Sequence, residues 1–231
     1  MKIIGHRGAS AVMPENTLAA FARAWDIGAD GIELDVRLTL DGEVVVFHDE
    51  DGRRLAGVPG LVSHTLYSAL AGWRINGESI PRLDEVLTAS PPNSLTLVEI
   101  KCGADILPRL QTIMAGHPDR PVGFLTFDSD LALKTVQSFP GYPVLLNLES
   151  TEVARLESWA TFAVEHRLTG LSMGWSGMMD AVAVRLLHRH GLWAAVWTVN
   201  DPVAVRHALV CGVDLLMTDD PGGMILQVHR G

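Results

Sequence analysis

The chain has 231 residues, of which 48% are hydrophobic and 19% charged, and its net charge is −9. This length can bury one sizeable core as a single barrel-type domain over residues 1–231, and the composition excludes a disordered chain. The negative net charge argues against binding of a nucleic acid, because that would need a basic protein surface. A few local cations can still bind an anionic ligand.

The two cysteines, Cys102 and Cys211, lie far apart and show no CxxC spacing. This argues against a disulfide framework or a zinc site and favours a reducing compartment. No apolar leader precedes the first predicted strand, and no run of about 20 apolar residues is present that could cross a bilayer. We therefore expect a cytoplasmic protein without a membrane span, and leave its oligomeric state open.

The first elements follow from apolar runs and turn residues. Residues 2–5 form an apolar run that predicts a strand. A helix follows, with Asn16 or Thr17 as its cap, and Gly28 ends it. Residues 31–36 predict a second strand.

A hairpin follows the second strand. Asp41-Gly42 stands between apolar runs and leaves no room for a crossover of about 12 residues, so residues 44–47 should run antiparallel to the second strand. Folding the chain at this turn brings His48 back towards Asp35. Residues 49–79 are rich in glycine and break the helix–strand rhythm, so we interpret them as a small insertion with one short helix near 65–71.

From residue 80 onwards, helices and strands alternate. Strands are expected at 95–100, 122–126, 144–148, 171–173, 192–199 and 215–218. Helices are expected at 83–88, 105–115, 131–138, 151–166, 181–190, 202–211 and 223–228. Eight strands, each followed by a helix, predict an α/β fold of the (β/α)8 TIM-barrel type with a small insertion after strand two. A doubly wound open sheet is the alternative, but its GxGxxG fingerprint is absent.

Two carboxylates stand on one face of the second strand. Glu33 and Asp35 are two residues apart and therefore project together, where they repel each other. A hard divalent cation relieves such repulsion and prefers oxygen ligands. The alternative is a surface strand with both carboxylates in water, but a barrel strand is buried on both faces.

Further polar residues follow the ends of other strands, where the active site of a TIM barrel lies. These are His6 and Arg7, His48, Glu99 and Lys101, Trp197 and Asn200, and Asp219 and Asp220.

Each of these residues also has a structural interpretation. Arg7 can be an ion-pair partner of Glu33, and Lys101 can merely neutralise Glu99 rather than contact a phosphate. Trp197 can be a core residue or a wall of the substrate site.

The motifs resemble those of the glycerophosphodiester phosphodiesterase family over nearly the whole chain. The matching residues are His6-Arg7-Gly8, Pro14-Glu15-Asn16-Thr17, Glu33-Leu34-Asp35-Val36, Asp41-Gly42, His48-Asp49, Ile80-Pro81 with Leu83-Asp84-Glu85-Val86-Leu87, Glu99-Ile100-Lys101, and Trp197-Thr198-Val199-Asn200. The sequence departs from the family where Asp51-Gly52-Arg53-Arg54-Leu55-Ala56-Gly57 replaces a usual Asp-Arg-Thr-Thr run, which bears on the choice of alcohol.

The resemblance implies a role for each site residue. It implies catalytic histidines at His6 and His48, and metal ligands at Glu33, Asp35 and Glu99. It also implies phosphate contacts from Arg7 and Lys101. The fold that it implies is a (β/α)8 barrel with a small insertion.

The function that follows is metal-dependent hydrolysis of small-molecule glycerophosphodiesters to glycerol 3-phosphate and an alcohol. One histidine would take a proton from the attacking oxygen and the other would protonate the leaving alkoxide. The cofactor would be a divalent metal, Mg²⁺ or Ca²⁺, with Mn²⁺ also compatible, and the attacker would be water or the substrate's own 2-hydroxyl. The alternatives are a lysophospholipase D-like phosphodiesterase and a non-catalytic phospho-ligand-binding barrel.

Overall fold

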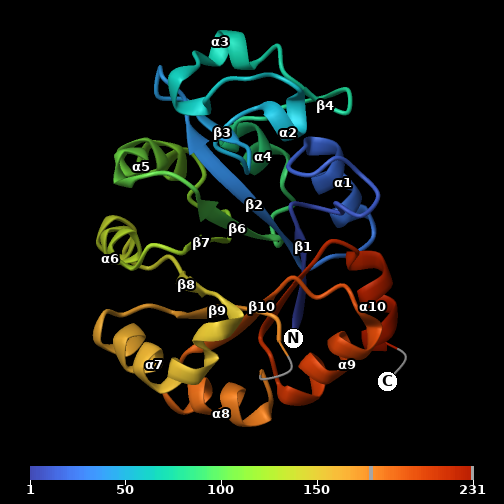
Figure 1. The fold of residues 1–231 in the computed structure, drawn as a ribbon, viewed down its shortest axis with the longest axis vertical. Coiled ribbons are helices and arrows are strands. Elements are labelled where there is room, and N and C mark those ends of the chain that lie inside the picture. Colours follow the sequence, from blue (N-terminus) through green and yellow to red (C-terminus); the bar gives the residue numbers. More distant parts are fainter. Residues whose placement is uncertain (177–178, 230–231) are drawn as a thin grey trace.

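The computed structural model describes residues 1–176 and 179–229, and its central feature is a closed ring of strands (Figure 1). The strands follow one another around the ring in the order β1, β11, β10, β9, β8, β7, β6 and β2, and β1 pairs with β2 to close it. All of these pairings are parallel. Their bounds are β1 Lys2–His6, β2 Gly31–Leu38, β6 Leu95–Ile100, β7 Val122–Thr126, β8 Val144–Leu148, β9 Gly170–Gly174, β10 Trp193–Trp197 and β11 Leu215–Thr218. The predicted (β/α)8 barrel is confirmed.

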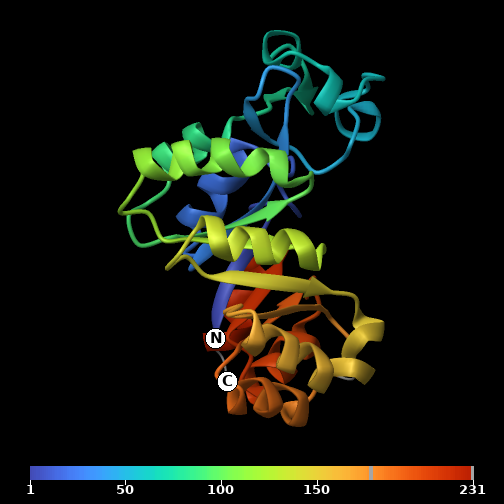
Figure 2. The ribbon, with the colours of Figure 1, turned by 90° about the vertical axis from the view of Figure 1, so that its left-hand side faces the viewer.

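Helices lie around the outside of the ring (Figures 1 and 2). They are α1 Leu18–Asp26, α4 Leu83–Ala89, α5 Leu107–Gly116, α6 Ser129–Ser138, α7 Leu156–Glu165, α8 Ala181–Arg189, α9 Pro202–Cys211 and α10 Pro221–His229. Their apolar faces and the outer faces of the strands share one large core, which includes Phe21, Leu34, Phe124 and Leu187. Among the described residues, no helix is long and apolar enough to cross a membrane.

The inside of the ring holds a smaller core of its own. It contains Ile4, Leu95, Leu97, Leu125, Leu145, Ala195, Leu215 and Met217. Because side chains alternate between the two faces of a strand, the residue two positions beyond each of these also faces inward. This periodicity places His6, Glu99, Phe127, Asn147, Trp197 and Asp219 at one end of the barrel.

Element boundaries differ from the predictions at helix starts. The helix predicted over 151–166 begins instead with the 3₁₀ segment η3, Ser150–Arg155, before α7. The helix predicted over 105–115 likewise begins with η2, Ala104–Ile106, and Pro108 then stands in the first turn of α5, where the missing N–H costs nothing.

The helix that follows the first strand is capped by Thr17. Its hydroxyl accepts a hydrogen bond from the N–H of Ala20 at 3.2 Å. Asn16, the other expected cap, has φ of 59° and turns its side chain towards β2 instead. Thr17 thus caps the helix, and the side chain of Asn16 is left to contact Asp35 on β2.

Beyond β2, the chain forms the predicted hairpin and then a small separate layer. The strand β3, Val44–Val46, pairs antiparallel with β2. It leads to α2 Arg53–Ala56, η1 Val62–His64, α3 Tyr67–Leu70 and the strands β4 Arg74–Ile75 and β5 Glu78–Ser79. This layer projects from one side of the barrel, at the top of Figures 1 and 2. One short helix was expected here near 65–71, whereas the structure forms two short α-helices, a 3₁₀ turn and a hairpin around Phe47, Leu70 and Trp73.

Candidate active site

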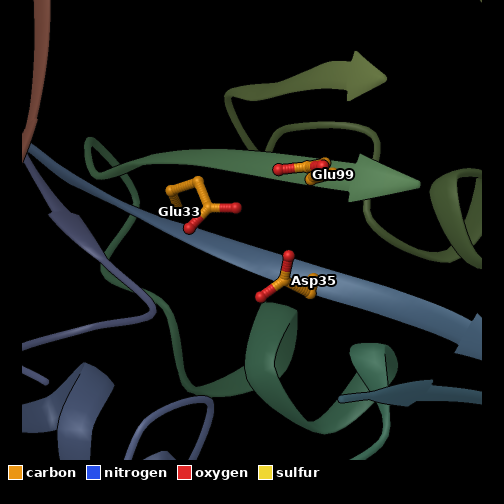
Figure 3. Close-up of side chains that lie close together, drawn as sticks. All are labelled: Glu33, Asp35 and Glu99. Atoms are coloured by element: carbon orange, nitrogen blue, oxygen red, sulfur yellow. The ribbon is translucent and has the colours of Figure 1, made fainter. Parts of the chain in front are cut away.

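The strand register brings three carboxylates together. Asp35 on β2 lies directly opposite Glu99 on β6, and Glu33 lies one inward position before Asp35. One oxygen from each carboxylate lies within 4.8 Å of the others, and all three residues are buried. Figure 3 shows the two β2 side chains and the β6 side chain turned towards one space.

This acidic triad has the properties of a cation site. The oxygen Glu33 Oε1 is buried and accepts no hydrogen bond from the described residues, whereas Asp35 Oδ1 and Glu99 Oε1 are buried with Lys101 as their neighbour. Burial raises the pKa of Glu33 to about 8, and the neighbouring charge of Asp35 adds to this rise. Burial and Asp35 likewise raise the pKa of Glu99. Oxygen ligands whose negative charge is under-compensated suit a hard divalent cation, so the residues fit Mg²⁺ or Ca²⁺.

Two cations flank the triad. The Nζ of Lys101 lies 2.5 Å from Glu99 Oε1 and 3.4 Å from Asp35 Oδ1. The Nε of Arg7 lies 3.1 Å from Asp35 Oδ2. Burial would raise the pKa of Asp35, but the charges of Arg7 and Lys101 outweigh it and lower this pKa below its usual value. Lys101 therefore does neutralise Glu99, but it shares its charge with Asp35.

The contacts of Arg7 differ from the alternative interpretation, in which its guanidinium pairs with Glu33. Its backbone N–H donates to Glu33 Oε2 at 3.1 Å, while its guanidinium contacts Asp35 and donates to Glu15 Oε1 at 2.8 Å. The backbone of Arg7 has φ of 55°, so the chain turns sharply after β1 and holds both groups over the triad.

His6 is held by a carboxylate from the other end of the chain. Its Nδ1 lies 2.7 Å from Asp219 Oδ1. Burial would raise the pKa of Asp219, but hydrogen bonds from His6, Asn200 and Ser10 lower it to about 2. An ionised carboxylate only accepts, so Nδ1 of His6 donates and Nε2 is left facing Glu33, 3.9 Å from Oε2.

Asn200 supports this arrangement and does not cap the helix that follows it. Asp201 caps α9 instead. The Nδ2 of Asn200 donates to Asp219 Oδ2 at 2.6 Å, and its Oδ1 accepts from the N–H of Asp219 at 2.9 Å. Asp219 is thereby fixed on both sides.

His48 has a matching carboxylate next to it in the chain. Its Nδ1 lies 2.7 Å from Asp49 Oδ1. The hairpin places it beside β2, because the N–H of Phe47 donates to the carbonyl of Asp35 at 2.9 Å. Burial lowers the pKa of His48, and the opposing charges of Asp35 and Asp49 do not restore it.

The insertion contributes one residue to this network. Arg54 on α2 donates to Asp49 at 2.7 Å through Nε and to Glu15 Oε2 at 3.0 Å through Nη1. Glu15 in turn accepts from Arg7. A continuous series of hydrogen-bonded charges thus runs from the carboxylate that holds His48 to the guanidinium above the triad.

Asn16 completes the inner layer. Its Nδ2 donates to Asp35 Oδ2 at 2.8 Å, and its Oδ1 accepts from the N–H of Asp35 at 3.3 Å. This fixes the carboxylate so that its other oxygen, Oδ1, faces Glu99 and Lys101.

A cleft of about 270 Å³ opens over these residues. Seven of the eight predicted site residues line it, and Asp35 lies beneath them. On its far side the ring of Trp197 meets Phe127 edge to face, with centroids 5.5 Å apart, and Lys101 lies 5.5 Å from the Phe127 centroid. Trp197 is therefore a wall of the cleft rather than only a core residue. The lining residues are His6, Arg7, Glu33, His48, Glu99, Lys101, Leu125, Phe127, Asn147, Glu149, Trp197 and Met217.

Sequence reasoning assigned no role to several residues that hold this site. Asp49, Glu15, Arg54 and Asn16 orient site residues, and Asp219 was noted only as following the last strand. Phe127 and Asn147 could have been found, because each stands two positions beyond an inward-facing leucine on a predicted strand. Arg54 carried no comparable signal.

Comparison with known proteins agrees with this geometry. The model of the Glycerophosphoryl diester phosphodiesterase family matches residues 6–223. The glycerophosphodiester phosphodiesterase of Caldanaerobacter subterraneus is 29% identical to this chain over 99% of the chain and 98% of that protein. The crystal structure of the Thermotoga maritima glycerophosphodiester phosphodiesterase superposes with a TM-score of 0.86 at 29% identity, covering 98% of this chain and 97% of that chain.

A phosphodiesterase of Oleispira antarctica, solved in complex with the product sn-glycerol-3-phosphate, has a TM-score of 0.90 at 24% identity, covering 99% and 97% of the two chains. At this identity the likeness supports the fold. The match of the family model over almost the entire chain carries the assignment: this protein belongs to the glycerophosphoryl diester phosphodiesterase family and is an enzyme of that family.

Proposed function

We propose that this enzyme hydrolyses glycerophosphodiesters to glycerol 3-phosphate and an alcohol, with a divalent metal and two histidines. One observation carries the proposal. Two histidines, each held by a carboxylate through Nδ1, lie beside a buried triad of carboxylates that is flanked by an arginine and a lysine.

The residues that would hold the metal are Glu33, Asp35 and Glu99. When bound, Mg²⁺ or Ca²⁺ supplies positive charge that stabilises the developing negative charge of the phosphoryl oxygens. The buried Oε1 of Glu33 supports this assignment, because it accepts no hydrogen bond from the described residues and would otherwise stay desolvated.

Arg7 and Lys101 would bind the phosphodiester. Both cations lie on the rim of the triad and both line the cleft. A diester monoanion repels nucleophiles, so two fixed cations beside it lower the barrier to attack. The same cations orient the phosphorus between the two histidines.

The histidines divide the proton transfers. His48 has a lowered pKa and is neutral near pH 7, so its Nε2 takes the proton from the attacking oxygen, of water or of the substrate's 2-hydroxyl. His6 then donates a proton from Nε2 to the departing alkoxide while Asp219 stabilises the imidazolium. The two transfers balance, and each is typically worth ~10²–10⁴-fold in rate.

Replacing either histidine tests the proposal. His6→Ala and His48→Ala should each lower the turnover of glycerophosphocholine by at least about 10²-fold and leave the thermal unfolding midpoint close to that of the unchanged protein. His64→Ala is the matched control, because His64 is exposed in the insertion. Chelation should abolish turnover, and Mg²⁺ or Ca²⁺ should restore it. Wild-type rates in both histidine variants would refute the mechanism.

A lysophospholipase D-like activity is the second candidate, but the structure offers it little support. A lysolipid would need an apolar channel, but Val62, Leu70 and Trp73 pack into the core of the insertion itself. None of the larger apolar residues of the insertion lines the cleft; these are Leu61, Val62, Leu66, Tyr67, Leu70 and Trp73. We expect faster turnover of glycerophosphocholine than of a lysophospholipid. A non-catalytic binder would not need both histidine–carboxylate pairs, and turnover of any glycerophosphodiester would exclude it.

The cytoplasm remains our proposal for where the enzyme works. Both cysteines are free, which suits a reducing compartment. Fractionation of the native host would test it.

A further inference from the structure

The ring of Phe127 has no task in the proposed proton transfers or in the proposed metal site. Phe127 directly follows β7, lines the cleft and is 43% exposed. A single exposed ring is common on protein surfaces and by itself indicates nothing. Its neighbours therefore decide whether this ring contributes to the reaction.

The ring of Phe127 contacts an indole and a cation. The ring centroid of Trp197 lies 5.5 Å from that of Phe127 and the two planes make an angle of 83°, so the rings meet edge to face. This geometry is favourable because the positive edge of one ring meets the negative face of the other. The Nζ of Lys101 lies over the Phe127 ring, 5.5 Å from its centroid, within the range of a cation–π interaction.

The ammonium of Lys101 is also attracted by the acidic triad. Its Nζ contacts Glu99 Oε1 and, at 3.4 Å, Asp35 Oδ1. The lysine side chain is a flexible four-carbon stem, so its own covalent structure does not fix where the charge lies. Carboxylates alone would draw the ammonium towards the triad and compensate its charge there.

An aromatic ring attracts a cation in a different way. The face of the ring is negative through its quadrupole, but the ring has no net charge and does not repel an anion as a carboxylate does. The ammonium beside Phe127 can therefore act on an anion in the cleft, which Lys101 also lines. A carboxylate in the place of this ring would hold the ammonium equally well but would repel a phosphodiester.

We propose that Phe127 is a positioning residue for the phosphodiester reaction: its ring, oriented by Trp197, holds the ammonium of Lys101 at the cleft, where it contacts the phosphate. This inference rests on the proposed function, in which Lys101 binds the phosphodiester. Phe127 acts through Lys101 and forms no bond with the reacting atoms.

The first test removes the ring and then restores it. Phe127→Leu should lower kcat/KM for glycerophosphocholine by about 3- to 30-fold, the range of a cation–π interaction, and should raise the inhibition constant of inorganic phosphate by a similar factor. Phe127→Tyr keeps an aromatic face and should stay within about twofold of wild type in both measurements. Equal losses in Phe127→Leu and Phe127→Tyr would contradict the inference.

A double variant distinguishes positioning of Lys101 from a general effect on the shape of the cleft. If the ring acts through the ammonium, adding Phe127→Leu to Lys101→Met should lower kcat/KM by less than about twofold further. If the ring only shapes the cleft, the two losses should multiply, and this outcome overturns the inference.

Ring fluorination tests the interaction without a change of shape. Phenylalanine derivatives with one, two and three ring fluorines, placed at position 127 alone, weaken the negative face stepwise, so kcat/KM should fall with each fluorine. A flat series overturns the inference even if Phe127→Leu fails to fold.

Trp159→Leu is the matched control. The Cζ of Arg155 lies 5.4 Å from the centroid of the Trp159 ring, so this is a second cation–π pair, but it lies at α7 and does not line the cleft. Turnover by this variant should stay within about twofold of wild type. Absence of any turnover by wild type would overturn the proposed function instead, so the wild-type rate distinguishes the two failures.

Discussion

The two sides of the cleft are built on the same scaffold and carry opposite chemistry. On β6, Glu99 stands two residues beyond the inward-facing Leu97, and on β8, Asn147 stands two residues beyond Leu145. The positions are equivalent, yet the first belongs to a group of ionised and titrating residues and the second to a neutral wall. The barrel thus supplies inward positions at one end of every strand, and the residue type alone decides which of them bind charge.

The comparison also shows how each side holds its polar groups. On the charged side, each histidine has a carboxylate partner and each cation has at least one, so orientation is fixed before substrate binds. On the neutral side of the cleft, which Phe127, Asn147 and Trp197 form, the Oδ1 of Asn147 and the Nε1 of Trp197 have no hydrogen-bond partner among the described residues. Preorganised charge suits stabilisation of a transition state, whereas unpaired neutral groups suit selection of a ligand.

The largest difference should appear between removing a carboxylate from the charged side and removing the exposed carboxylate of Glu149, which also lines the cleft. We expect Glu99→Gln to lower turnover by at least about 10²-fold and to weaken the dependence on added Mg²⁺ or Ca²⁺, because metal charge stabilisation is worth several kcal/mol. Glu149→Gln, at the exposed rim of the neutral side, should change turnover by no more than about threefold. Turnover of both variants would be measured over a range of Mg²⁺ or Ca²⁺ concentrations. Equal losses of turnover in the two variants would contradict the assignment of different roles to the two sides of the cleft.

A smaller but still large effect is expected at Asp219. Asp219→Asn removes the acceptor that orients His6 and stabilises its protonated form, so kcat should fall by about 10²-fold with little change in KM. Asp220→Asn is the control, because among the described residues the Asp220 side chain hydrogen-bonds only the N–H of Gly223. Steady-state kinetics would decide the matter, and similar kcat values for the two variants would argue against an orienting role.

The pH dependence of kcat/KM should show the effect of Asp49 on the pKa of His48. Burial lowers the pKa of His48, and the hydrogen bond that His48 donates to Asp49 partly opposes this, so the acid limb of kcat/KM should lie below the ordinary imidazole value of about 6.5. Asp49→Asn removes a group that raises this pKa, so the limb should move to still lower pH while kcat falls. Asp51→Asn should leave the limb in place. A shift of the limb to higher pH would contradict the assignment of His48 as the base.

The smallest effect is expected from the insertion. Arg54→Ala leaves Asp49 and Glu15 without their shared partner, and we expect about a fivefold loss of kcat, since Arg54 is half exposed and such ion pairs are worth at most about 1 kcal/mol each. Arg53→Ala, on the same turn of α2 but 74% exposed, should behave as wild type. Added guanidinium should partly restore Arg54→Ala. Indistinguishable rates for the two alanine variants would show that the insertion does not contribute to the active site through Arg54.

Much of the charged side could be predicted from the sequence. The spacing of Glu33 and Asp35 and the hairpin at Asp41-Gly42 are local patterns, and both placed their residues where the structure has them. The eight-strand ring followed from the alternation of apolar runs. The insertion was less predictable, because its four-residue helices are too short to leave a periodic pattern.

The sequence by itself determined which residue types face inward at the ends of the strands. The two-residue period of a strand and the turns that bound it both follow from the local sequence. Only the tertiary structure decided which of these residues touch. Asp219 lies 213 positions from His6, and they meet because the ring closes between its first and last strands. Arg54 lies 39 positions from Glu15, and they meet because α2 lies beside the segment that follows β1. Such contacts depend on the summed packing of many elements, which no local stretch of sequence encodes.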